Sequence, residues 1–206
     1  MLHYNYLLFD AAKAEMNLYN AMELNPNHQS LYKGSAEEDL VGVAPYLFSI
    51  KENTPFADWY FKEGWNQSWG TLLFANAAFE DVYKHFRKFL MVKTEDGQQL
   101  YFRFYDPRVL RIFLPTCEEP GQLKELFGPV RHFLTESENE DEVLQFWLEG
   151  EILRTKTLPF IDEPELIEAQ IRQSEIPVNE MIVKEDVKPE ESLLNKPKKK
   201  RDFFLE

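Results

Sequence analysis

The aromatic side chains are unevenly distributed along the chain, and this places the hydrophobic core in its first two thirds. Of the 17 Phe, 9 Tyr and 4 Trp residues, 25 fall within residues 1–134 of a 206-residue chain. Apolar residues make up 44% of the sequence, a share typical of packed globular domains. We therefore expect a core domain over residues 1–134 and exclude a wholly disordered chain.

The distribution of acidic and basic side chains distinguishes further segments along the chain. Residues 1–134 carry 17 acidic and 13 basic side chains, whereas residues 135–174 carry 11 and 3. We interpret residues 135–174 as an acidic helical extension and the proline-spaced residues 175–206 as a flexible, mobile tail. A net charge of −13 opposes nucleic-acid binding, because that affinity comes from Lys and Arg displacing counterions. A nucleic-acid binder using the basic run 198–201 is a further alternative, which the net charge opposes.

Helical and β-type patterns alternate, which predicts a mixed α/β fold with a sheet flanked by helices. The expected strands are 4–9, 43–50, 69–74, 90–93, 99–105 and 130–134, of which 90–93 and 99–105 form a hairpin. The expected helices are 11–24, 55–61, 79–90, 107–113, 122–127 and 141–153. Asp10 and Asp106 stand where N-capping side chains are preferred, and Pro107 suits the first helical position.

The helix expected over residues 79–90 has the clearest apolar stripe. We expect this stripe to be buried together with the preceding apolar strand, through Phe79, Val82, Tyr83, Phe86, Leu72 and Phe74. The physical reason is that a helical stripe and a neighbouring apolar strand have to cover each other.

No membrane or secretion signal is visible, so we expect a cytoplasmic protein that does not enter a membrane. No run approaches 18 apolar residues, and the apolar residues 6–9 lack a basic segment before them. Cys117 is the only cysteine, which agrees with a reducing compartment.

The sequence gives little support to any single candidate for a catalytic or metal-binding residue. Cys117 is followed by two glutamates that disfavour its thiolate. Ser68 lacks the glycine two residues earlier that a nucleophile elbow needs. Asp81 and His85 share a helix face and could supply two metal ligands, although a surface hydrogen bond is commoner. We therefore expect no catalytic residue, no metal and no cofactor.

Three arginines surround one aspartate in the string FRFYDPRVLR, residues 102–111. Arg103, Arg108 and Arg111 could clamp an anion or a partner carboxylate. Alternatively, Asp106 pairs internally with one of them and fixes the hairpin to the next helix. We favour the internal role for Asp106, whereas Arg108 and Arg111 stay open to either interpretation.

An ordered set of motifs resembles a known bacterial family. The motifs lie at residues 7–12, 44–47, 64–70, 85–90, 101–110, 113–115 and 127–130, within a resemblance that covers residues 5–134. The sequence is similar to the family of domains of unknown function numbered 4123. That resemblance implies a non-catalytic chaperone or adaptor of type VI secretion, which holds a secreted effector in the cytoplasm and helps place it on the spike-tip protein. Asn66 departs from the pattern, which has glycine there.

We accordingly predict two protein partners, an effector and a spike-tip protein, and neither nucleic acid nor membrane. The predicted partner-binding residues are Arg103, Arg108, Arg111, Trp65 and Trp69. The rival prediction is an enzyme that binds an anionic small substrate through Arg108 and Arg111. We expect residues after Leu134 to govern the choice of partner.

Overall fold

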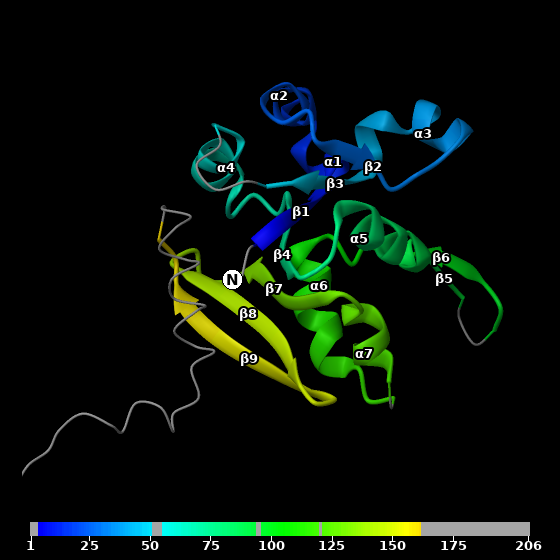
Figure 1. Ribbon diagram of the computed structural model, residues 1–206, viewed down its shortest axis with the longest axis vertical. Coiled ribbons are helices and arrows are strands. Elements are labelled where there is room, and N and C mark those ends of the chain that lie inside the picture. Colours follow the sequence, from blue (N-terminus) through cyan, green and yellow to red (C-terminus); the bar gives the residue numbers. More distant parts are fainter. Residues whose placement is uncertain (1–3, 51–54, 94–95, 120, 162–206) are drawn as a thin grey trace, which may run out of the picture. The chain divides into compact units, whose positions relative to one another are not determined.

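Seven strands form one antiparallel sheet with helices against both faces (Figure 1). The computed structural model describes residues 4–50, 55–93, 96–119 and 121–161. The strand order is β2-β3-β1-β4-β7-β8-β9, and all neighbouring pairs are antiparallel. A separate two-stranded sheet joins β5 and β6. The predicted α/β class, a sheet flanked by helices, is confirmed.

Most elements lie close to their predicted positions. The strands are β1 Tyr4–Asp10, β2 His28–Ser30, β3 Pro45–Ser49, β4 Gly70–Ala75, β5 Met91–Lys93, β6 Gln99–Tyr101, β7 Val130–Glu136, β8 Glu142–Glu149 and β9 Ile152–Pro159. The α-helices are α1 Ala11–Ala14, α2 Asn17–Leu24, α3 Ser35–Asp39, α4 Pro55–Trp59, α5 Phe79–Phe86, α6 Pro107–Phe113 and α7 Gln122–Phe127. The helix expected over 11–24 is divided because Glu15 takes a φ of 52°, which a helix cannot accommodate.

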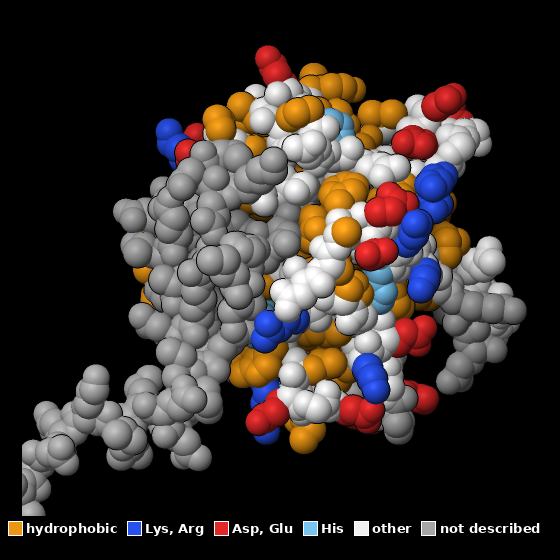
Figure 2. Space-filling view, viewed as in Figure 1, with side chains coloured by type: hydrophobic (Ala, Val, Ile, Leu, Met, Phe, Trp, Pro, Cys, Tyr) orange, Lys and Arg blue, Asp and Glu red, His pale blue; other side chains and the backbone are white. Residues whose placement is uncertain are grey.

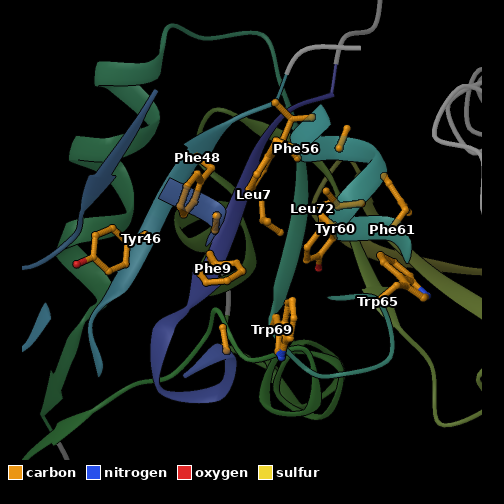
Figure 3. Close-up of a cluster of buried hydrophobic side chains, with 14 of the residues drawn as sticks. Leu7, Phe9, Tyr46, Phe48, Phe56, Tyr60, Phe61, Trp65, Trp69 and Leu72 are labelled. Atoms are coloured by element: carbon orange, nitrogen blue, oxygen red, sulfur yellow. The ribbon is translucent and has the colours of Figure 1, made fainter. Parts of the chain in front are cut away.

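Strand β4 lies at the centre of the sheet, and both of its faces are buried. Leu72 and Phe74 point into a cluster formed with α1, α2 and α4 (Figure 3). Leu73 and Ala75 point into a second cluster formed with α5, α6 and α7. A continuous apolar strand is therefore explained by helices on both sides of it.

The predicted contact between the 79–90 stripe and Leu72 or Phe74 is wrong. The stripe packs on the opposite face of β4 from these two side chains. Val82, Tyr83 and Phe86 of α5 are buried as expected, but they pack in the cluster of Leu73. Side chains alternate between the faces of a strand, and a strand that is apolar throughout does not indicate which face meets which helix.

The predicted helix over 141–153 is also wrong, because β8 and β9 form a hairpin there. β8 pairs with β7, which itself crosses the predicted boundary at residue 134. The acidic segment thus begins inside the core sheet rather than as a helical extension. Glu149 pairs with Ile152, which leaves Gly150 and Glu151 as the two-residue turn, with a φ of 66° at Gly150. Such turns favour glycine. The predicted tail, 175–206, lies outside the described residues.

Candidate partner-binding site

Two buried aspartates begin two helices and are joined through one arginine. Asp10 precedes α1 and Asp106 precedes α6, and each accepts a hydrogen bond from the backbone N–H two residues later, at 3.1 and 3.0 Å. The Nη2 of Arg103 contacts Asp10 and lies 3.7 Å from Asp106. Arg108 binds Asp106 through two atoms, Nε at 3.0 Å and Nη2 at 2.6 Å. The predicted caps and the internal pairing of Asp106 are confirmed.

These contacts balance the charges within the cluster. Burial acts to raise the pKa of the Asp106 carboxyl, but hydrogen bonds from Arg108 and the positive charge of both arginines outweigh it and hold that pKa below its ordinary value. Burial raises the pKa of Asp10, although Arg103 opposes this. Because two guanidinium groups face two carboxyl groups, an incoming anion would have to compete with partners already in place.

Arg111 points inward rather than toward solvent. Only 16% of its side chain is exposed. Its Nη1 donates to the backbone oxygen of Glu136 at 3.4 Å, and its Nη2 lies 3.5 Å from Glu138. The buried Nε has no hydrogen-bond partner within the described part of the chain. Arg111 therefore links α6 to the end of β7, which favours the internal of its two interpretations.

The two tryptophans predicted as partner contacts are core residues. Trp65 stacks against Phe61 and Phe160, with ring centroids 5.6 and 5.2 Å away, and Trp69 meets Phe9 at 6.1 Å (Figure 3). They expose only 4% and 7% of their surface. Both side chains therefore have a packing role in the folded chain.

An open hollow lies beside α6. It measures about 510 Å³ and is lined by Asp106, Arg108, Val109, Ile112, Phe113 and Thr116. Ile112 is 64% exposed, whereas Leu110 and Leu114 of the same segment are fully buried. Arg108, with 42% of its side chain exposed, is fixed at the rim by Asp106. The hollow can accept an apolar side chain beside an oriented guanidinium group.

Sequence reasoning did not single out this hollow, although a signal for it exists. Ile112 stands two residues after Leu110 and two before Leu114, so a helix cannot bury all three on one side. The exposed position of Ile112 could have been inferred from that spacing.

A strained loop lies between α4 and β4 and is held by a buried carboxylate. Asn66 and Ser68 take φ values of 63° and 59°, a region that residues other than glycine seldom occupy. The Ser68 N–H donates to both carboxylate oxygens of Glu136, at 3.1 and 3.0 Å. The side-chain amide of Asn66 donates to the backbone oxygen of Glu140 at 2.9 Å. The conformation accounts for glycine at this position of the motif, and asparagine tolerates it better than most residues.

Substitutions at Asn66 test this strain. We expect Asn66→Gly to change the free energy of unfolding by less than about 0.5 kcal/mol, and Asn66→Val to lower it by about 1–2 kcal/mol. Chemical denaturation measures both. Gln67→Val is the matched control, because Gln67 is exposed and is not among the residues with positive φ. Equal losses for valine at the two positions would contradict the strain argument.

The other candidate groups have structural partners. The His85 ring nitrogen Nε2 lies 2.9 Å from the backbone oxygen of Leu126, so this side chain joins α5 to α7. The half-buried thiol of Cys117 faces the backbone oxygen of Phe113 at 3.5 Å, and burial raises its pKa. Within residues 4–50, 55–93, 96–119 and 121–161, no three His, Cys, Asp or Glu side chains are placed to hold a metal ion.

Comparison with known proteins gives one match. A sequence model described as a domain of unknown function, DUF4123, matches residues 5–124. The chain belongs to the DUF4123 family. No curated protein and no solved structure matches it. The matched residues include the aspartate and arginine cluster and the hollow, whereas Glu136 and strands β7 to β9 follow after them.

Proposed function

We propose that this protein is a non-catalytic chaperone or adaptor that binds a type VI secretion effector in the cytoplasm and helps load it onto the spike-tip protein. The observation that carries the proposal is the open apolar hollow beside α6, with Ile112 exposed in it. Membership of the DUF4123 family supports the proposal through the resemblance described above. None of the helices described in the structure is long and apolar enough to cross a membrane.

The fixed position of the residues that line the hollow suits recognition of a protein surface. Binding sites between proteins usually place apolar anchors inside a polar rim, and Arg is enriched at them. Here Asp106 fixes both the start of α6 and the guanidinium group of Arg108. A helix fixed in this way loses little freedom on binding, so less of the interaction energy is spent on ordering the site.

Co-purification tests the proposal. The full-length chain, expressed together with candidate effector and spike-tip proteins of type VI secretion, is expected to retain an effector. Ile112→Asp should weaken that binding about tenfold or more, because it places a charge in an apolar contact. Ile152→Asp on β9 is the matched control, since Ile112 and Ile152 are 64% and 59% exposed. Undiminished capture by the Ile112 variant, or no capture by the unchanged chain, counts against the proposal.

The rival function, an enzyme for an anionic small substrate, predicts a different result. It requires Arg108 to exchange Asp106 for the substrate, so binding of small carboxylates or phosphates would have to stabilise the chain. Thermal unfolding with and without these anions distinguishes the two functions, and the adaptor proposal predicts no stabilisation.

A further inference from the structure

The β5–β6 hairpin exposes apolar side chains on both of its faces. Met91 pairs with Tyr101 and Val92 pairs with Leu100, and residues directly opposite each other point to the same face. These four side chains are 41%, 63%, 38% and 48% exposed, in that order. The pair forms its own sheet of two strands, so within the described residues each strand has one edge that pairs with no further strand. Such edges can accept another strand.

The base of the hairpin is anchored to the rest of the structure. The backbone N–H of Phe102 donates to the Leu90 oxygen at 3.0 Å. The ring of Phe102 lies 4.6 Å from that of Phe113, which lines the hollow beside α6. The apolar surface of the hairpin is therefore connected with the hollow through two aromatic rings. In Figure 1 the hairpin extends outward beyond the end of α5.

The charge around the hairpin is opposite to that of the chain as a whole. Residues 84–101 contain four Lys or Arg and two Asp or Glu, whereas the chain carries −13; Arg103 is not counted, because it binds Asp10. Lys84 and Lys88 are exposed at the end of α5 just before the hairpin, and basic side chains appear over this end of α5 in Figure 2. Lys84 is paired with Glu80 at 3.2 Å. Complementary charges guide association and exclude partners of the wrong sign.

We infer that the β5–β6 hairpin is a docking element for an extended segment of the effector, a segment with apolar side chains on both faces and Asp or Glu beside them. This inference rests on the proposed function and adds the chemistry of the bound segment to it. Strand addition supplies backbone hydrogen bonds to the open edge, and apolar side chains of the added strand cover Met91, Val92, Leu100 and Tyr101. Carboxylates next to the segment meet Lys84 and Lys88.

Binding of the co-purified effector to the full-length chain tests the docking element. Val92→Thr with Leu100→Thr should weaken the apparent affinity about tenfold or more, because threonine keeps the strand but removes apolar contact area. Met16→Thr with Val43→Thr is the matched control, with exposures of 75% and 49% at the two sites. Thermal unfolding should be unchanged in both variants, since all four positions lie on the surface.

The acidic character of the partner is tested separately. Lys84→Gln with Lys88→Gln should weaken binding more at low than at high ionic strength. A photoreactive residue in place of Leu100 should crosslink to an effector segment that combines an apolar run with Asp or Glu, as read by mass spectrometry. A crosslinked segment rich in Lys and Arg would overturn the inference.

The remaining outcomes distinguish this inference from the proposed function. If the unchanged chain and the hairpin variant capture the effector equally, the docking element is wrong while the adaptor function stands. If the unchanged chain captures no effector, both are wrong. If the hairpin instead joins two copies, the unchanged chain sediments as a dimer and the hairpin variant as a monomer, which also overturns the inference.

Discussion

Replacing Asp106 by alanine is expected to lower the free energy of unfolding by about 3–4 kcal/mol. The substitution removes the cap of α6, for which about 1 kcal/mol is typical. It also leaves Arg103 and Arg108 without their shared carboxylate. About 40% of each guanidinium side chain is exposed, so water compensates in part, and the loss is smaller than for a fully buried pair. Urea denaturation of the full-length chain measures the change.

Two further variants separate the causes of that loss. Asp106→Asn keeps a capping side chain and should therefore recover the cap contribution, leaving a loss of about 2–3 kcal/mol. Asp81→Asn is the matched control, because Asp81 is an exposed acid in the first turn of α5, and it should cost less than about 0.5 kcal/mol. A loss at Asp106 as small as that at Asp81 would mean that the buried cluster contributes little to stability.

The contribution of Glu136 to the stability of the protein is expected to fall as the pH rises from about 4.5 to about 7. Burial raises the pKa of this carboxyl to about 7 from an ordinary value of 4.5, against the opposing hydrogen bonds from Ser68 and Asn66. The folded chain therefore holds this proton more tightly than the unfolded chain does. The resulting stability is complete below pH 4.5 and is lost as the pH passes 7, a loss of about 3 kcal/mol.

Glu136→Gln isolates this contribution from that of other groups, such as Asp10, whose pKa is also raised. The amide keeps an oxygen for the Ser68 N–H but does not titrate. We expect the difference in unfolding free energy between the unchanged chain and the variant to shift by about 3 kcal/mol from acid to alkaline pH. Denaturation curves across that range measure the shift. A constant difference would show that the folded and unfolded chains hold this proton equally tightly, so that burial does not raise the pKa of Glu136.

Local signals in the sequence were sufficient for much of the fold. The caps at Asp10 and Asp106 and the stripe of α5 are properties of short segments, and each is found in the structure. The helix predicted over 141–153 failed because Val143, Leu144, Trp147 and Leu148 fit a helical spacing as well as a strand. Pairing with the neighbouring strands β7 and β9 decides between the two, and the spacing of apolar residues within β8 alone does not contain that pairing.

The site was harder to predict than the fold. The internal pair of Asp106 and Arg108 could be inferred because the residues are two apart in the chain. In contrast, the contact between Glu136 and Ser68 joins residues 68 positions apart, and neither residue has a sequence signal for it. The packing of Trp65 and Trp69 was equally hidden, because the side chains that they contact, such as Phe160 and Phe9, are far away in the sequence.

The family match and the folded sheet end at different places in the chain. The family match ends at residue 124, but β4 takes one of its two neighbours from β7, residues 130–136. The segment that relatives share in sequence is therefore smaller than the unit that completes the sheet. A fragment cut at the end of the shared segment would carry a central strand with a bare edge, and bare edges recruit other chains. The properties of residues 5–124 alone would then be those of a sheet that lacks β7 and the strands beyond it.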